Sequence, residues 1–230
     1  MRMKTHLAEL AFILDRSGSM QHLAGAAIEG FNHFLKEQQS APGWARLTLA
    51  LFDDEYLLPA ESLPVAEVLP LDEHSYVPRN STALLDAIGR TVDELGARLA
   101  AMPEGDRPGK VIVAILTDGL ENASIHYTWR DIAGRIRHQT NVYGWEFLFL
   151  GANQDAIATA AQLSIAAANS ATFQADRAGV KSTGGALARK SRALRAQSLG
   201  GGAPEVVADA AAKMSDLVRE EDRKERGGGK

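Results

Sequence analysis

Three segments of the chain carry oxygen-bearing side chains at spacings that could hold a hard metal ion. Asp15, Ser17 and Ser19 occupy alternate positions at the end of an apolar run. Thr82 stands where a helical pattern begins, and Asp118 follows a second apolar run. Because ligands of an open parallel sheet bind at the carboxyl ends of its strands, we expect these five side chains to meet at one edge. Two carboxylates and three hydroxyls form an all-oxygen set, which suits Mg²⁺ or Mn²⁺.

The elements that must position these side chains follow from the hydrophobic pattern. Short apolar runs alternate with segments whose apolar residues recur every three or four positions, as in buried strands and amphipathic helices. The predicted strands cover residues 7–14, 45–52, 55–58, 111–116, 146–150 and 165–168. The predicted helices cover residues 20–39, 82–102, 127–140 and 153–163. This alternation predicts an α/β fold with a doubly wound, mostly parallel sheet, helices on both faces and one short antiparallel edge strand at 55–58.

Composition narrows the classes of function. The chain has 230 residues, no cysteine and a formal net charge of −4. The missing thiols exclude disulfides, Cys-ligated zinc and iron–sulfur clusters, and the negative balance argues against a dedicated nucleic-acid binder. No apolar run approaches the ~20 residues that a membrane helix needs, and Glu9 interrupts the run that superficially looks like a signal peptide. We therefore expect a cytoplasmic protein that contacts neither nucleic acid nor membrane.

Charge divides the chain into unlike parts. Residues 1–176 carry 13 basic and 22 acidic groups, whereas residues 177–230 carry 12 basic and 7 acidic groups. We expect a domain at 1–176, a basic helical segment at 177–199 and a dispensable segment at 200–230 joined through three glycines. This last segment contains a candidate helix at 204–226 and is interpreted either as a mobile tail or as a helix that forms with a partner. The basic cluster of the middle segment comprises Arg189, Lys190, Arg192 and Arg195. It is interpreted either as a solvated helix face or as a contact for an acidic partner or for the domain's own acidic surface.

Residues 11–20 read AFILDRSGSM and resemble the first motif of von Willebrand factor type A (VWA) domains, the D-x-S-x-S of the metal-ion-dependent adhesion site, or MIDAS. Thr82 followed by Ala87 resembles the second motif, and residues 116–119, LTDG, resemble the third. The resemblance extends over about residues 7–170. It implies a Rossmann-like sheet and a site built from five residues. In that site the metal would be contacted directly by the hydroxyls of Ser17, Ser19 and Thr82. The carboxylates of Asp15 and Asp118 would act through water or switch inward.

The sequence departs from the VWA pattern in the loop before Thr82. It has Asn80-Ser81 where many members of the family have two glycines, which leaves the loop conformation open. Glu121, Asn122 and residues 151–155 are expected on the same rim and look like features of a stand-alone bacterial or phage VWA subgroup. No ligand role is assigned to them.

The resemblance implies metal-dependent binding rather than turnover. We expect a bacterial protein–protein interaction module, not an enzyme, whose metal takes an Asp or Glu of a partner protein. Similar bacterial proteins suggest an AAA+ ATPase or a stress-response component as that partner. Two alternatives remain: a hydrolase that uses the same ion to activate water, and a structural subunit whose metal only stabilises the loops. The three tryptophans, Trp44, Trp129 and Trp145, are expected to pack between helices and sheet.

Overall fold

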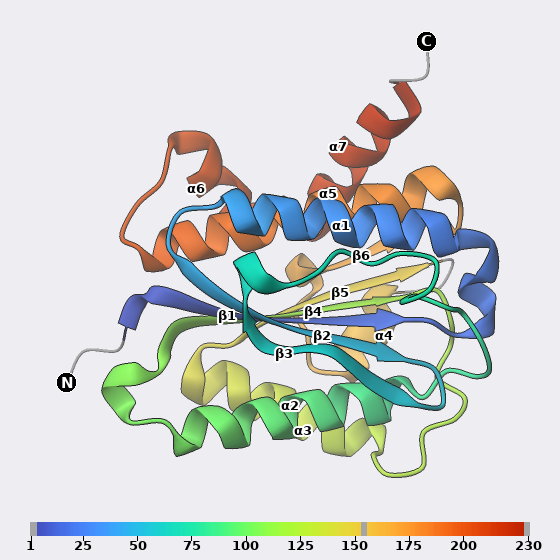
Figure 1. The fold of residues 1–230 in the computed structure, drawn as a ribbon, viewed down its shortest axis with the longest axis horizontal. Coiled ribbons are helices and arrows are strands. Elements are labelled where there is room, and N and C mark those ends of the chain that lie inside the picture. Colours follow the sequence, from blue (N-terminus) through green and yellow to red (C-terminus); the bar gives the residue numbers. More distant parts are fainter. Residues whose placement is uncertain (1–3, 153–155, 228–230) are drawn as a thin grey trace.

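A computed structural model describes residues 4–152 and 156–227 as a six-stranded sheet between two layers of helices (Figure 1). The sheet order is β3-β2-β1-β4-β5-β6. Only the β2–β3 pair is antiparallel among these described strands, so the predicted Rossmann-like α/β fold is confirmed. The strands are β1 (Lys4–Asp15), β2 (Trp44–Phe52), β3 (Tyr56–Pro64), β4 (Pro108–Thr117), β5 (Glu146–Ala152) and β6 (Ser170–Phe173).

The central strands are apolar on both faces because helices cover both. In β1, Phe12 packs toward the layer that contains α1 and α5, whereas its neighbour Ile13 packs toward α2 and α3. Phe12 lies opposite Leu49 of β2 and Ala114 of β4 in the parallel ladders. The alternation of side chains along each strand thus supplies two separate cores from one continuous apolar run.

Helices on each face of the sheet come from separate parts of the chain. One face is covered by α1 (Ala24–Ser40) and α5 (Arg177–Ser198), and the other by α2 (Leu84–Ala101), α3 (Trp129–Tyr143) and α4 (Ala156–Gln162). Short 3₁₀ helices cover Gly18–Leu23, Val65–Glu67, Glu104–Asp106 and Ala167–Asn169. No helix in the described part of the chain is both long and apolar enough to cross a bilayer.

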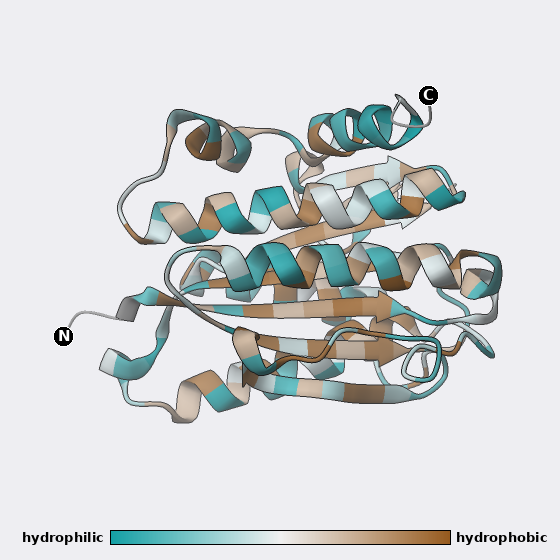
Figure 2. Ribbon diagram, turned by 45° about the horizontal axis from the view of Figure 1, so that its top comes forward, coloured by the Kyte–Doolittle hydropathy of each residue, from teal (hydrophilic) through white to brown (hydrophobic). Residues whose placement is uncertain are grey.

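The last two helices, α6 (Pro204–Ala211) and α7 (Met214–Gly227), pack against α5, and α7 also contacts the edge strand β6. Figure 2 shows that α7 is mainly hydrophilic, but its few apolar residues share one face, and Met214, Leu217 and Val218 are buried. The structure therefore differs from the expected mobile tail at 200–230, because this narrow apolar face docks on α5 and on the end of the sheet. The assignment of 1–176 as a separate domain stays a prediction.

The basic cluster of residues 189–195 makes contacts within the fold. Arg189 forms ion pairs with three acidic residues of the last two helices: Asp209, Glu220 and Glu221. The Lys190 ammonium is buried and donates to the backbone carbonyls of Ala210 and Ala212 at 2.7 and 2.6 Å. These contacts explain why α6 and α7 stay against α5, since both basic groups find their partners there.

The other two members of the basic cluster face α1. Arg192 pairs with Glu37 at 2.8 Å, and the buried Arg195 donates to the backbone and side-chain oxygens of Gln38 at 2.8 and 3.0 Å. Burial lowers the pKa of Arg195 to about 10. The expectation of a fully solvated basic face is therefore wrong, and contact with the domain's own surface is the interpretation that the structure supports.

Several predicted element boundaries move in the structure. The strand expected at 165–168 lies instead at 170–173, because Ile165 is buried beneath α4 on the α2–α3 side of the sheet rather than paired in the sheet. The helix expected at 20–39 begins as a 3₁₀ turn and becomes α-helical at Ala24. Residues 153–155, the first three of the helix expected at 153–163, lie outside the described residues. Trp145 is buried as expected, whereas Trp44 is 75% exposed at the start of β2.

Candidate metal site

Three loops meet where the parallel strands β1 and β4 end (Figure 1). The first follows β1 and contains Asp15, Ser17 and Ser19. The second precedes α2 and contains Thr82, and the third follows β4 and contains Asp118. The five residues proposed from the sequence therefore gather at one edge of the sheet, as the chain order of parallel strands requires.

A short chain of hydrogen bonds joins four of these residues. The Ser17 backbone N–H donates to Asp15 Oδ1 at 2.7 Å. The Ser17 and Ser19 hydroxyl oxygens lie 3.0 Å apart, and the Ser19 hydroxyl donates to Asp118 Oδ1 at 2.6 Å. The first and third loops are thus connected through the side chains that the sequence singled out.

Thr82 approaches the same space from the second loop, and Gly119 leaves room for it. A Cβ added to Gly119 would lie 2.7 Å from the Thr82 hydroxyl oxygen and 3.5 Å from Asp15 Oδ2. Such a contact with Thr82 is shorter than real side chains allow, so a side chain at position 119 would displace the hydroxyl. The glycine keeps open a cradle between the threonine hydroxyl and the buried carboxylate.

Both carboxylates are held in surroundings that disfavour their negative charge. Burial raises the pKa of Asp15 to about 6, although hydrogen bonds from Thr117 and Ser17 partly counter that effect, and the charge of Asp118 adds to it. Burial also raises the pKa of Asp118. Two acids that share a poorly solvated space are stabilised in their charged form by a nearby cation. The donor set therefore fits a divalent metal ion.

Two further hydrogen bonds hold the side chain and the backbone of Asp15 in place. Thr117, the last residue of β4, donates from its hydroxyl to Asp15 Oδ2 at 2.5 Å. The buried Tyr76 hydroxyl donates to the Asp15 backbone oxygen at 2.5 Å. Sequence reasoning assigned no role to Tyr76, because its segment is rich in proline and shows no periodic pattern that would predict burial.

Comparison with solved structures shows which fold this arrangement shares. The proximal thread matrix protein 1 (PTMP1) of the mussel byssus, solved with a zinc-occupied MIDAS motif, matches with a TM-score of 0.54 and 15% identity over 80% of this chain and 46% of PTMP1. The manganese-loaded TRAP protein of Plasmodium vivax matches with a TM-score of 0.53 and 14% identity over 74% of this chain and 69% of that one. A VWA protein from Catenulispora acidiphila matches with a TM-score of 0.51 and 19% identity over 84% of this chain and 42% of the Catenulispora chain.

The chain has a VWA-like fold. No protein-family model and no curated protein matches its sequence. The likeness therefore rests on the structure, and the VWA-like chain spans less than half the length of PTMP1 and of the Catenulispora protein.

The departure from the VWA pattern at Asn80 has a structural explanation. Asn80 has a φ of +56°, in the left-handed region that favours glycine and that asparagine tolerates better than most residues. Its carbonyl accepts a hydrogen bond from the Gly18 N–H at 3.0 Å, and its side-chain amide donates to Asp54 at 2.8 Å. Asparagine can therefore replace glycine here and still close the second loop against the first.

Asp53, a residue that sequence analysis did not single out, connects the loops of the VWA-like site. Its fully buried carboxylate lies 3.1 Å from Arg16 Nη2 and accepts a hydrogen bond from Arg79 Nε at 2.8 Å. Its backbone oxygen accepts from the Ala83 N–H at 2.8 Å. Arg16 follows Asp15 and Ala83 follows Thr82, so Asp53 fixes the distance between the first and second loops.

Two rim residues that were left without a role hold the second loop and α2. Asn122 Oδ1 accepts from the Thr82 N–H at 2.9 Å, and the Asn122 N–H donates back to the Thr82 oxygen at 3.0 Å. Glu121 accepts from the Leu85 N–H at 2.9 Å, so its carboxylate lies at the N-terminus of α2, where negative charge is stabilised. The third loop therefore orders the second through the two residues that follow Leu120.

Among the described residues, no three His, Cys, Asp or Glu side chains gather closely enough to hold a metal ion. A site of two carboxylates and three hydroxyls falls outside that pattern, since serine and threonine supply most of its ligands. The composition of the candidate site thus differs from that of structural zinc sites built from Cys and His.

Proposed function

We propose that the chain is a divalent-metal-dependent protein-binding module. Its metal would be Mg²⁺ or Mn²⁺, held by the hydroxyls of Ser17, Ser19 and Thr82 and by the carboxylates of Asp15 and Asp118. Its partner would be a protein that offers an Asp or Glu side chain to the same site. The VWA-like fold, with neighbours solved in manganese-loaded and zinc-occupied forms, supports a site of this general kind.

The single observation that carries the proposal is the cradle around Gly119. The Thr82 hydroxyl and the Asp15 carboxylate come from different loops, yet both approach the space that a Cβ at position 119 would fill. Two of the three atoms nearest to this space are oxygens, the third being the Thr82 methyl carbon, and oxygen ligands are what a small hard cation needs.

The chemistry of the ligands indicates what the site would bind. Hydroxyl oxygens carry no charge, so a metal held mainly by them keeps a strong attraction for an incoming anionic oxygen. Ser19 is exposed, which leaves the site open to solvent and to a partner. A carboxylate on a protein surface meets these requirements, and an AAA+ ATPase or a stress-response component in the bacterial cytoplasm is the partner that we propose to test.

Thermal denaturation with and without metal tests the site. Saturation at about 100 times Kd stabilises a folded protein by about 2.7 kcal/mol, which corresponds to roughly 5–11 °C in Tm for a chain of this size. Asp118→Ala removes a ligand, and Gly119→Ala fills the cradle without removing one, so both variants should lose the rise in Tm. Glu67→Ala changes an exposed acid at the opposite edge of the sheet and should respond like the parent. A parental response in Asp118→Ala would show that the site is misassigned.

Partner capture tests the function separately from the site. Proteins retained by the immobilised chain in Mg²⁺ should be released by excess chelator, and Ser17→Ala should weaken their retention. Retention that persists in chelator would place partner binding on another surface. Metal-dependent turnover of generic phosphoester or peptide substrates would instead favour the hydrolase alternative.

A further inference from the structure

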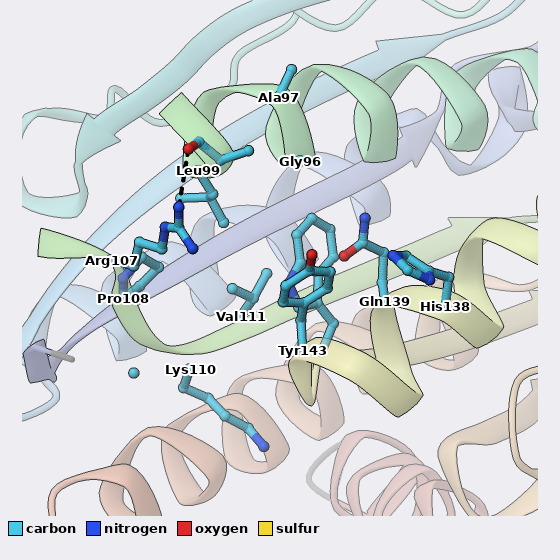
Figure 3. A pocket seen from close by; sticks show the side chains of 13 residues that line it. Gly96, Ala97, Leu99, Arg107, Pro108, Lys110, Val111, His138, Gln139 and Tyr143 are labelled. Atoms are coloured by element: carbon cyan, nitrogen blue, oxygen red, sulfur yellow. Dashed lines mark hydrogen bonds between the residues drawn. The ribbon is translucent and has the colours of Figure 1, made fainter. Parts of the chain in front are cut away.

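A cavity of about 380 Å³ lies at the opposite end of β4 from the candidate metal site (Figure 3). It is bounded by the C-terminal halves of α2 and α3 and by the start of β4. The cavity exists because α2 presents small residues there, including Gly96 and Ala100. Cavities of this volume are large enough for a small organic molecule.

The inner wall of the cavity is apolar and partly aromatic. Leu99 of α2, Val111 of β4 and Trp145 at the start of β5 contribute to it. Trp145 is only 4% exposed, and its indole stacks on Phe147 with 6.2 Å between ring centroids. Such a rigid apolar wall favours a flat, apolar ligand group over a hydrated one.

The polar groups around the cavity are mainly donors. In Figure 3, Arg107 lies on one side of the cavity, with Gln139 and Tyr143 across from it. Arg107 donates through Nη2 to the Ala100 carbonyl at 3.0 Å and through Nε to the Met102 carbonyl at 3.2 Å. These bonds fix the guanidinium in place, but carbonyl oxygens do not neutralise its charge.

The charge of Arg107 has no counterion in the described part of the chain. None of the residues that line the cavity is an Asp or Glu, and none of the ion pairs among residues 4–152 and 156–227 involves Arg107. Lys110 differs from it, because its ammonium points away from the cavity in Figure 3 and pairs with Glu146 at 2.9 Å. The cavity thus combines an apolar wall with one immobilised cation.

We infer that this cavity is a binding site for a small aromatic carboxylate. The ring would lie against Trp145 and Val111, and the carboxylate would accept hydrogen bonds from Arg107 and Gln139. An arginine held by neutral acceptors suits this role, since the bound carboxylate supplies the negative charge that neutralises the guanidinium. The site is independent of the metal, because it lies at the other end of the sheet.

Titration of the ¹⁵N-labelled full chain with indole-3-propionate, followed by NMR, tests the inference. The largest shifts should occur at the Gln139 side-chain amide and the Trp145 indole N–H, and they should be the same in chelator. Arg107→Gln removes the charge and should weaken binding at least tenfold. Arg137→Gln, an exposed arginine of α3 that does not line the cavity, is the matched control and should bind like the parent.

A second variant tests the position of the binding site, and a second ligand tests the need for a negative charge. Gly96→Leu directs a side chain toward Gln139, since a Cβ there already lies 3.3 Å from Gln139 Nε2, and should abolish binding while the melting curve stays cooperative. Indole-3-propionamide, which lacks the negative charge, should bind at least tenfold more weakly than the acid. Equal binding of acid and amide, or unchanged binding in either cavity variant, would overturn the inference.

Discussion

Substitution of Gly184 by alanine should destabilise the fold, although alanine is the better helix former. Gly184 of α5 crosses α1 at Gly30, and a Cβ on Gly184 would lie 2.3 Å from the Gly30 carbonyl oxygen and 2.6 Å from its Cα. Both atoms belong to the backbone, so no side-chain rotation relieves the contact. The two helices would have to separate by about 1 Å to reach ordinary van der Waals distance.

The size of the effect follows from two opposing contributions. Overpacking of a well-packed core costs about 1–3 kcal/mol, and a contact with backbone belongs near the upper end of that range. Alanine regains about 1 kcal/mol of helix propensity. The net loss of about 2 kcal/mol corresponds to a fall in Tm of roughly 4–8 °C for a chain of this length.

Thermal and urea denaturation of three matched variants measures the effect. Gly134→Ala in α3 has no atom within 4 Å of the new Cβ and should raise Tm by about 2–4 °C, because it gains only the propensity term. Gly30→Ala, with its nearest contact at 3.3 Å, should fall between Gly134→Ala and Gly184→Ala. A Gly184→Ala variant as stable as the parent would refute the close crossing of α1 and α5.

Three other predictions concern the loops, the C-terminal helices and pH. Asp53→Asn should weaken Mg²⁺ or Mn²⁺ affinity about 10–100-fold in calorimetry while the far-ultraviolet circular dichroism is kept, because the residue positions two metal-site loops without being a proposed ligand. Truncation after Leu199 should give an aggregating or much less stable protein, since it removes three buried apolar side chains of α7 worth up to about 1.5–3 kcal/mol each; a truncated chain with parental Tm would contradict this. Burial raises the pKa of Glu9 in the folded protein above its ordinary 4.5. The stabilisation that comes from this raised pKa is fully present below pH 4.5 and is lost as the pH rises through the pKa of Glu9 in the folded protein. The stability of Glu9→Gln relative to the parent should therefore increase from about pH 4 toward pH 7 in urea titrations, and a constant difference would contradict the raised pKa.

The sequence alone determined the architecture of the sheet and the composition of the candidate site. The apolar runs that end at Asp15 and Thr117 are long enough to be buried on both faces, and they predict central parallel strands. Once those strands are parallel, the residues that follow them must meet at one edge. Asp15, Ser17 and Asp118 could therefore be grouped from their positions in the chain, because each follows an apolar run that the sequence shows directly.

Tertiary packing decided how the loops are held. The positive φ of Asn80 and the burial of Asp53 depend on segments that are distant in sequence, and nothing in the neighbouring residues encodes them. Asp53 stands in an exposed-looking Asp-Asp-Glu turn, yet it is fully buried because Arg16 and Arg79 approach it from two other loops. A charged residue is buried only where partners are available, and pairing of this kind is not visible in a local pattern.

The C-terminal helices show the same limit most clearly. A helical period predicts which residues share a face, but not whether another segment covers that face. Arg195 looked like part of a solvated basic face, and it is buried against α1 because Gln38 and the carbonyls after α1 supply its hydrogen-bond acceptors. Leu217 is one of few apolar residues in its helix, and it is buried because it joins the apolar cluster that includes residues of α5. Burial is a property of two surfaces, and the sequence of one helix specifies only its own.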